Sequence, residues 1–459
     1  MAKSNSGRVP LSASGVCGVA ALLLCVTACA PDPQLVRLDV YDWWDQDAEK
    51  VAFDSVLQRY KRKWSNTDVV TTTDDRAPYT RDRLARRMLA GAPPATFQAN
   101  SGADLLRWTM VDTDSSRPSK CSIQGLTELF QRTGLTGTVP EPLLKALQVG
   151  GSDTPYAVPI DIHRLNVLYI NHAAGQRYAD KHPDKSLLDL STLCPDDPNA
   201  APLLAPLALG AQQRFTLVLL ALENLLPALA GADFYEAFLR GEEPSSVAGV
   251  GDWRVDVRRA LRCTQYLAKS ATNLGEGWTD AVEEVRSGAA TFTVMGDWAG
   301  GQFAADLALG KVDAHPFPNT DTLFVFTSDT FPLPIGTEHP VEAEQLLETL
   351  ASPDAQKIFS EFKGSIPARN DVVVEGQLGK LAAQTQRDFA RTRQLGASSA
   401  YFPPYYPQDE LGERLFDMIS SRAGDDEIEA VVNLLRDAMP ALAAWQARLK
   451  QGASEPGLP

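Results

Sequence analysis

Strand and helix candidates alternate along nearly the whole chain, and this alternation constrains the fold more than any other feature of the sequence. The first candidate strand, Leu35 to Tyr41, alternates apolar and polar residues, and a helix with an apolar face and a basic end follows it up to Lys63. Such alternation predicts an α/β fold. The chain has 459 residues, of which 44% are hydrophobic and 22% charged, so it is long enough for two lobes with separate cores.

Aromatic and polar side chains stand at the ends of several predicted strands. The apolar run from Ala290 to Met295 breaks at Gly296 and delivers Asp297 and Trp298. An aromatic face beside a carboxylate suits a sugar, which offers C–H patches for stacking and hydroxyls that donate hydrogen bonds. The structural alternative for this stretch is a buried tryptophan beside a helix-capping aspartate.

The same combination recurs far away in the sequence. Trp43 and Trp44 follow the first strand, and Gln98 and Asn100 stand at a later strand-to-turn junction. The extended segment from Tyr156 to Asn171 is interrupted by polar residues, namely Asp161, His163 and Arg164. Such a segment is typical of a crossing between two lobes. We therefore expect these residues at an interlobe cleft, the usual position of a small-molecule site.

Other segments add to the predicted core. Leu217 to Leu229 is strongly apolar but too short to span a bilayer, so we expect a core helix there. A further strand is expected from Pro202 to Gly210, and the tail from Asp425 to Leu449 has the apolar periodicity of a helix. Leu323 to Phe326 and Thr330 to Leu333 have extended patterns that could carry the chain back across the lobes.

The first 29 residues have the pattern of a secretory signal. Lys3 and Arg8 precede an apolar run of small residues, and Val26-Thr27-Ala28 stands directly before Cys29. This ending resembles the lipobox of bacterial lipoproteins, in which the cysteine is acylated and becomes the mature N-terminus. We therefore expect an extracytoplasmic protein that is anchored to the cell-envelope membrane through Cys29. An ordinary signal peptide with an incidental cysteine is the alternative.

Charge and cysteine content narrow the possible partners. The formal net charge is −15, and it becomes −17 without the leader, which has two positive and no negative residues. An acidic exterior argues against nucleic acid or anionic lipid as partner. Cys121, Cys194 and Cys263 remain, and their spacing does not show which two could form a disulfide. No cysteine or histidine spacing typical of a metal site occurs, so neither a metal nor a cofactor is expected.

Common catalytic motifs are also missing. The sequence has no G-x-S-x-G elbow, no H-E-x-x-H, no Walker loop and no G-x-G-x-x-G after a strand. The residues therefore favour a binding protein over an enzyme.

Five motifs, in order over nearly the whole mature chain, resemble those of the extracellular solute-binding proteins of bacterial ABC sugar importers, especially the glucose/mannose-binding branch. The motifs are Trp43-Trp44 with Glu49, Leu89-Ala90-Gly91-x-Pro93-Pro94-x-x-Phe97-Gln98, Val158-Pro159-x-x-Ile162-His163-Arg164-x-Asn166, Met295-Gly296-Asp297-Trp298, and Gly364-Ser365-Ile366-Pro367-Ala368-Arg369.

The resemblance implies the two-lobed periplasmic-binding-protein fold, with a hinge and a ligand cleft between the lobes. The N-terminal lobe would comprise residues 36–160 with 315–365, and the C-terminal lobe residues 161–314 with 366–450. The family implies a monomeric, non-enzymatic receptor that captures a sugar, closes around it and delivers it to a membrane permease. A sugar sensor that signals to a membrane kinase and a secreted carbohydrate-active enzyme are the rival functions.

The resemblance also indicates site residues. Carried over position by position, the ligand-binding candidates are Trp43, Trp44, Glu49, Gln98, Asn100, Asp161, His163, Arg164, Phe215, Trp278, Asp297 and Trp298. Asn100 stands where the branch often has His, and Phe215 where it often has Trp, so the identity of the sugar stays open. Asp161 either faces the cleft or pairs with Arg164. An acid facing the cleft would repel an anionic ligand, which favours a neutral or amino sugar.

Overall fold

The computed structural model describes residues 35–45, 47–73, 77–109, 122–149, 152–197, 200–242, 252–402, 408–421 and 425–451. The predicted leader with Cys29 lies outside these residues, as does Cys121. No helix within these ranges has the length and apolar character that crossing a bilayer requires.

A parallel sheet forms the first layer of the fold. Strand β1 (Val36–Asp42) lies between β2 (Thr67–Thr73) and β3 (Thr96–Phe97). Helices α1 (Asp47–Lys63) and α16 (Pro353–Lys363) lie side by side next to this sheet, although about 300 residues separate them in sequence. The expected first strand and first helix are confirmed.

Three further sheets contain the remaining strands. The two antiparallel three-stranded sheets have the orders β4-β11-β5 and β8-β7-β9, and a four-stranded sheet has the order β12-β6-β10-β13. Their bounds are β4 (Ala99–Asn100), β5 (Ala157–Pro159), β6 (Asp161–Arg164), β7 (Val167–Asn171), β8 (Phe292–Met295), β9 (Val312–Pro316), β10 (Leu323–Thr327), β11 (Asp329–Pro332), β12 (Ile366–Pro367) and β13 (Arg393–Gly396).

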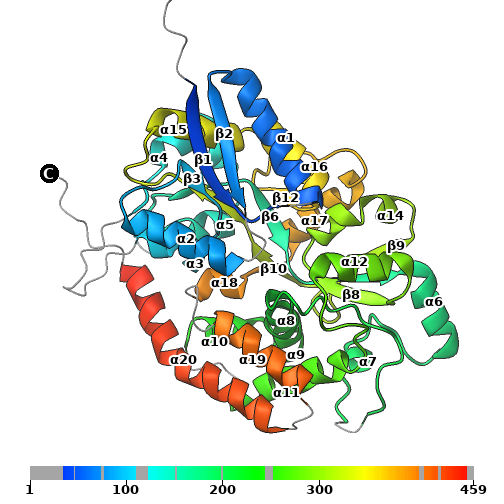
Figure 1. The fold of residues 1–459 in the computed structure, drawn as a ribbon. Coiled ribbons are helices and arrows are strands. Elements are labelled where there is room, and N and C mark those ends of the chain that lie inside the picture. The colour runs from blue at the N-terminus through cyan, green and yellow to red at the C-terminus, as the bar shows by residue number, and fades with distance from the viewer. Residues whose placement is uncertain are drawn as a thin grey trace, which may run out of the picture. The chain divides into compact units, whose positions relative to one another are not determined.

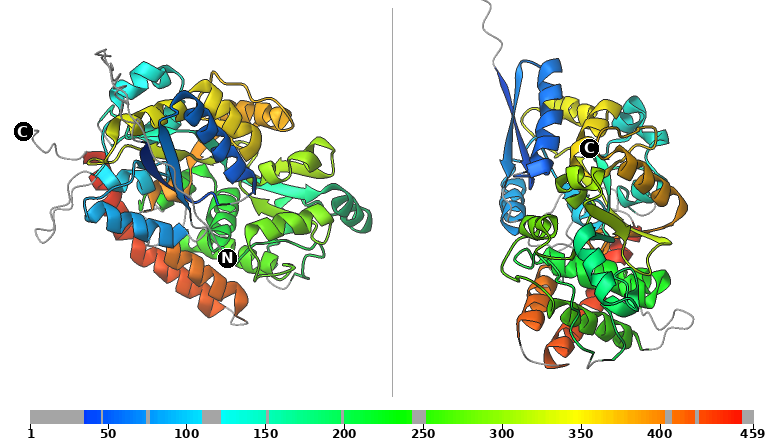
Figure 2. Two further views of the ribbon diagram at one scale, coloured as in Figure 1. Left: turned by 45° about the horizontal axis from the view of Figure 1, so that its top comes forward. Right: turned by 90° about the vertical axis from the view of Figure 1, so that its right-hand side faces the viewer.

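Helices surround these sheets, as two further views show (Figure 2). Those in the first part of the chain are α2 (Ala77–Leu89), α3 (Ala103–Leu106), η1 (Arg107–Thr109), α4 (Thr127–Thr133), η2 (Leu135–Gly137), α5 (Glu141–Ala146), α6 (His172–Lys181) and α7 (Leu190–Leu193). The middle part contains α8 (Phe215–Val218), η3 (Leu219–Leu225), α9 (Leu226–Ala230), α10 (Ala232–Leu239), α11 (Trp253–Ala268), α12 (Trp278–Ser287), α13 (Ala299–Gln302) and α14 (Ala304–Ala308). The last part contains α15 (Pro340–Leu350), α17 (Gly379–Arg391), α18 (Ser398–Tyr401), α19 (Gln408–Ser420) and α20 (Asp425–Gln451).

Two large hydrophobic clusters form the core, and strand β10 contributes to both. The aromatic-rich cluster is formed mainly by residues 38–162 and 324–389, whereas the leucine-rich cluster is formed mainly by residues 165–267 and 395–442. Successive side chains of a strand point to opposite faces. Accordingly, Phe324 and Phe326 belong to the aromatic-rich cluster, and Leu323 and Val325 belong to the leucine-rich cluster.

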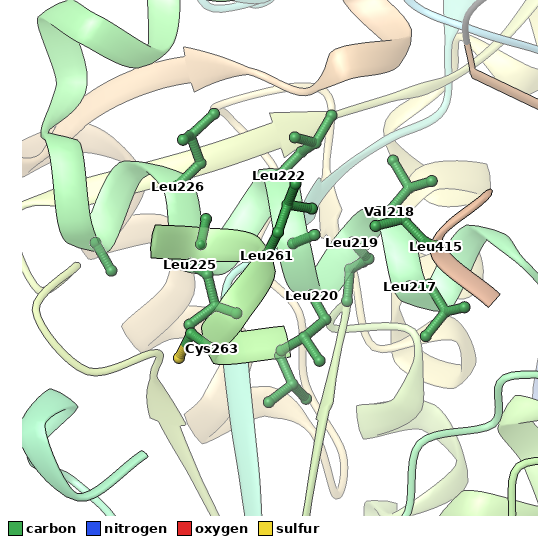
Figure 3. Close-up of a cluster of buried hydrophobic side chains, with 14 of the residues drawn as sticks. Leu217, Val218, Leu219, Leu220, Leu222, Leu225, Leu226, Leu261, Cys263 and Leu415 are labelled. Atoms are coloured by element: carbon green, nitrogen blue, oxygen red, sulfur yellow. The ribbon is translucent and has the colours of Figure 1, made fainter. Parts of the chain in front are cut away.

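The leucine-rich cluster confirms the predicted core helix, with one difference. Residues 215–230 are helical throughout, but their central part, η3, has the wider π-helical turn. Leu217, Leu219, Leu222 and Leu225 from this segment are buried with Leu261 of α11 (Figure 3). Apolar periodicity alone does not distinguish a π-turn from an α-turn, so the sequence could not predict it.

One predicted strand is wrong, and the structure answers one question that the sequence left open. The strand expected from Pro202 to Gly210 is wrong, because only isolated bridges form there, at Leu207. Two prolines in this segment lack the backbone N–H that a ladder needs. The open disulfide question is answered by a Cys194–Cys263 bond, with 5.1 Å between the Cα atoms.

Candidate functional site

Three aspartates surround the imidazole of His163. His163 and Asp161 lie on β6, Asp297 follows β8, and Asp329 begins β11. Nδ1 of His163 is 2.5 Å from Oδ1 of Asp297, and Nε2 is 2.8 Å from Oδ2 of Asp161 and 3.1 Å from Oδ2 of Asp329. All four side chains are buried. The ends of three strands that are far apart in sequence thus meet at one histidine.

Backbone bonds hold Asp297 in place. The backbone N–H of Arg164 donates to Oδ2 of Asp297 at 2.8 Å, and the N–H of Asp297 donates to the Arg164 carbonyl at 2.8 Å. Gly296 permits this turn, because a Cβ at that position would lie 2.0 Å from the Trp298 ring. The Gly-Asp-Trp sequence therefore fixes the carboxylate against β6.

Burial and neighbouring charges shift the pKa values of these groups. Burial opposes protonation of His163, but the charges of Asp161 and Asp297 outweigh it and raise the pKa of the imidazole well above its usual value. Burial also raises the pKa of Asp297 despite the opposing effect of His163. Each of the two groups therefore binds a proton more tightly than it would in water.

A buried lysine joins this cluster from α16. Lys363 forms an ion pair with Glu49 of α1, and its ammonium lies 4.0 Å from Oδ2 of Asp329 and 5.0 Å from the ring centroid of Trp44. Burial opposes the charge of Lys363, but Glu49 and Asp329 raise its pKa. Burial likewise disfavours ionised Asp329, but hydrogen bonds from His163 and the charge of Lys363 lower its pKa.

Three more of the predicted residues lie next to Asp329. Nε2 of Gln98 donates to Oδ1 of Asp329 at 2.7 Å, and Oε1 of Gln98 accepts from the backbone N–H of Trp43 at 3.0 Å. Asn100 of β4 stands opposite Asp329 of β11 in the antiparallel ladder. Trp43 and Asn100 are half-buried, so part of each side chain is open to solvent.

Aromatic rings extend the cluster on the other side of His163. The Trp298 ring meets the His163 ring edge to face, with 5.3 Å between centroids, and the Phe215 ring lies 6.3 Å from Trp298. Trp298 is half-buried and Phe215 is 40% exposed. These are the aromatic surfaces of the cluster that a ligand could reach.

Three predicted site residues have other surroundings. Trp44 is 1% exposed and packs against Phe53, Phe331 and Phe359, with ring centroids 5.0, 5.9 and 5.0 Å away. Its enclosed ring is not open for stacking on a ligand. Trp44 therefore contributes to the aromatic-rich core.

Trp278 and Arg164 are also enclosed. Trp278 is 7% exposed and belongs to a third hydrophobic cluster with Val282 and Met295. Arg164 is 4% exposed, and its Nη1 is 3.0 Å from Oδ2 of Asp388. The alternative pairing of Arg164 with Asp161 is therefore wrong, because Asp161 lies against His163 instead.

Sequence reasoning missed two members of the cluster, Asp329 and Lys363. Asp329 stands between two segments predicted to be extended, as a polar break like that at Asp161 and His163. Lys363 directly precedes the Gly364-to-Arg369 motif. A basic residue at the end of an amphipathic helix usually faces solvent, which is why the pattern alone did not single it out.

The arrangement offers acceptors, donors and aromatic faces, which are the elements of polar ligand recognition. It contains no serine, threonine or cysteine paired with a base as a nucleophile would be, among the residues described around His163. The geometry therefore suits binding.

Comparisons with known proteins identify the class. The family "Bacterial extracellular solute-binding protein" matches residues 98–386, which is more than half of the chain. The chain belongs to this family. The predictions of an extracytoplasmic protein and of a receptor that is not an enzyme are confirmed at this level.

Relatives and solved structures agree with this assignment. The chain is 27% identical over 343 residues to the "Uncharacterized ABC transporter extracellular-binding protein PH1214" of Pyrococcus horikoshii, covering 74% of this chain and 73% of the relative. It is 27% identical over 367 residues to the "Probable sugar-binding periplasmic protein" of Rhizobium meliloti, covering 77% and 80%. The structure of a chitin oligosaccharide binding protein matches with a TM-score of 0.68 and 16% identity, covering 88% of this chain and 99% of that one. This structural likeness confirms the predicted periplasmic-binding-protein fold.

Proposed function

We propose that this receptor captures a neutral or amino sugar and delivers it to an ABC permease, as the glucose/mannose-binding branch does. The observation that carries the proposal is the single cluster formed by most of the predicted ligand-binding residues, which come from distant parts of the chain. Two relatives named as an ABC transporter binding protein and as a sugar-binding periplasmic protein support it.

The ligand contacts in this proposal come from the accessible rim of the cluster. Trp43, Trp298 and Phe215 supply aromatic faces, and Glu49 and Asn100 supply half-buried polar atoms. Gln98 is buried behind this rim and supports Trp43 through its backbone N–H. The charge near this rim is determined by three buried residues behind it, His163, Asp161 and Asp297. Because the buried cluster is rich in carboxylates, it disfavours a uronate or a sugar phosphate.

Calorimetry with glucose, mannose, glucosamine, glucuronate and glucose phosphate tests the ligand class. We expect glucose, mannose or glucosamine to bind more tightly than either anionic compound. Tighter binding of an anionic sugar would contradict the proposal. A ligand that binds the folded state also raises the thermal midpoint, which provides a second readout.

Tryptophan substitutions test the location of the site. Trp298→Ala should weaken sugar binding by about 1–3 kcal/mol, because a large aromatic contact would be lost. Trp64→Ala is the matched control, since Trp64 is also half-buried but follows the far end of α1. A helix of 17 residues is roughly 25 Å long. Equal affinity losses in both variants would place the ligand elsewhere.

The proposed lobes comprise residues 36–160 with 315–365 and 161–314 with 366–450. Strand β6 and strand β10 lie where the two large hydrophobic clusters meet, which supports crossings at these positions. The clusters do not support a boundary at 365, because Ile366, Ala368 and Phe389 pack in the aromatic-rich cluster and the leucine-rich cluster resumes at Leu395. A hinge there would allow the ligand to stabilise a closed form. Small-angle scattering with and without saturating sugar should show compaction, and an identical profile would contradict the hinge.

The proposed lipid anchor at Cys29 has its own test. The chain would be acylated at Cys29 and held at the cell-envelope membrane. Cys29→Ala should release the protein from the membrane fraction of expressing cells. A variant that fractionates as the wild type does would show that the anchor is absent.

A further inference from the structure

Three potential metal ligands converge inside the cluster. They are Oδ2 of Asp161, Nε2 of His163 and Oδ2 of Asp329, and all lie within 4.8 Å of one another. The side chains are 0%, 3% and 5% exposed. Sequence spacing could not reveal them as a set, because Asp329 is 166 residues away from His163.

The environment of one carboxylate oxygen, Oδ2 of Asp161, is the first sign that these side chains bind a further component. Oδ1 of Asp161 accepts a hydrogen bond from the backbone N–H of Asp329 at 3.0 Å. Oδ2 is buried, and Nε2 of His163 lies 2.8 Å from it, an ion pair when the imidazole is protonated. When Nε2 carries no proton, as in a metal-binding imidazole, no described residue donates a hydrogen bond to Oδ2. The hydrogen-bond geometry at Nε2 is satisfied by Asp329 instead. A buried polar atom without a partner costs free energy, so it normally has one.

The balance of charge points the same way. Three carboxylates surround His163, while Lys363 is engaged mainly by Glu49. Four carboxyl groups, those of Glu49, Asp161, Asp297 and Asp329, thus form ion pairs with only two basic side chains of the described residues, His163 and Lys363. Buried charges are normally paired or bound to a metal. A divalent cation would supply the missing charge and the missing partner together.

The contact between His163 and Asp297 fits a metal-binding histidine. Histidine ligands usually donate their other ring N–H to a carboxylate or carbonyl, which fixes the tautomer and aims the free nitrogen at the metal. Nδ1 of His163 is 2.5 Å from Oδ1 of Asp297, and Oδ2 of the same aspartate is held by the backbone of Arg164. This pair leaves Nε2 to face Asp161 and Asp329.

We propose that Asp161, His163 and Asp329 bind a divalent transition-metal cation, with Asp297 as the positioning residue of His163. The mixed set of one imidazole and two carboxylates suits such a cation better than Ca²⁺ or Mg²⁺, which prefer oxygen alone. Three protein ligands also leave a coordination position open. This site goes beyond the proposed sugar binding. A bound cation would reduce the negative charge that disfavours anionic sugars, so sugar binding and metal binding are tested separately.

Titration of the protein with Zn²⁺ tests the site. The full mature chain, carrying Cys121→Ser to remove a thiol as an alternative ligand, is stripped with a chelator, exchanged into chelator-free buffer and titrated by calorimetry without sugar. We expect one Zn²⁺ per chain and a higher thermal midpoint. His163→Gln and Asp161→Asn should abolish this binding, whereas Asp297→Asn should weaken it about 10- to 100-fold.

An exposed histidine provides the matched control. Nδ1 of His172 lies 2.8 Å from Oδ2 of Asp313, so this pair has similar groups at the surface. His172→Gln should leave Zn²⁺ affinity unchanged. If the wild type binds no Zn²⁺, or if His172→Gln removes the binding and His163→Gln does not, the proposal is overturned.

X-ray absorption spectroscopy of the zinc-loaded chain covers the case in which the buried variants do not fold. The zinc should have one imidazole and otherwise only oxygen ligands. A shell with two or more imidazoles or a sulfur would overturn the proposal. Sugar titrations in the presence of chelator separate this result from the proposed function, because they test sugar binding without metal.

Discussion

Two buried polar networks in this molecule have similar burial but different balance. In the leucine-rich cluster, Oε1 of Glu223 accepts from the backbone and hydroxyl of Ser398, and Oε2 accepts from the hydroxyl of Tyr235. All donors are neutral, and both carboxylate oxygens have partners. Around His163, by contrast, three carboxylates share one imidazole, which lies within ion-pair distance of all three.

The difference shows how a structural network can be told from a binding network. The groups around Glu223 satisfy one another, so the network stabilises the fold without any further component. The groups around His163 carry excess charge, which a folded chain tolerates poorly unless a ligand or ion compensates it. Three predictions test this difference between the two networks.

Removing the ammonium of Lys363 should have the largest effect. Lys363→Met leaves Glu49 without its ion-pair partner and removes a cation 4.0 Å from Asp329, and breaking a buried ion pair typically costs about 3–5 kcal/mol. The free energy of unfolding from urea titration should fall by this amount. Lys357→Met, on the same helix, removes only a surface pair with Glu375 and should change stability little. Equal losses in both variants would contradict the imbalance argued for the His163 cluster.

Removing the disulfide of the leucine-rich cluster should have an intermediate effect on stability. The Cys194–Cys263 bond closes a loop with a sequence separation of 69, and loss of such a bond typically costs about 2–4 kcal/mol. The double variant Cys194→Ala/Cys263→Ala should therefore be less stable to urea but bind sugar with unchanged affinity. A large loss of sugar affinity would show that the two networks are coupled.

Substitution of Glu223 should have the smallest effect at neutral pH and should reveal a pH dependence. Burial raises the pKa of Glu223 above the usual glutamate value of 4.5. The folded state therefore binds the proton more tightly than the unfolded state. This stabilisation is fully present below pH 4.5 and is lost as the pH rises through the raised pKa.

Glu223→Gln keeps an acceptor for Ser398 but cannot ionise. The stability of the wild type relative to this variant should therefore fall as the pH rises above 4.5. Glu223→Ala should cost about 1–3 kcal/mol at any pH in this range, because the Tyr235 and Ser398 donors lose their acceptor. A pH-independent difference between the wild type and Glu223→Gln would show that Glu223 is ionised to the same extent in both states.

Much of the fold was predictable because local patterns decide it. The alternation from Leu35 to Tyr41 predicts β1, and the apolar periodicity after Asp425 predicts α20. The error at Pro202 to Gly210 arose because an apolar run resembles a strand whether or not its backbone N–H groups can join a ladder. The π-turn of η3 lies against α11, and no local sequence pattern records such tertiary packing.

Site residues that belong to sequence motifs could be predicted. Site residues that are recognised only by their contacts in the folded structure could not. Gln98, His163 and Asp297 were expected from their motifs, and the structure brings them together through Asp329. Asp329 itself has no motif, and its importance comes from lying opposite Asn100 and against His163. Trp44 illustrates the reverse case, since a tryptophan pair does not show which ring turns toward the core.

The position of β10 has a consequence for how the molecule unfolds. Its phenylalanines belong to one core and its alternate aliphatic residues to the other. A slip of one residue would exchange the two sets and bring large rings into spaces that fit Leu323 and Val325. Unfolding of either core would therefore expose one face of β10 to solvent, while the opposite face of β10 belongs to the other core. We therefore expect the two cores to share one unfolding transition, and the backbone amides of β10 should be among the last to exchange with solvent.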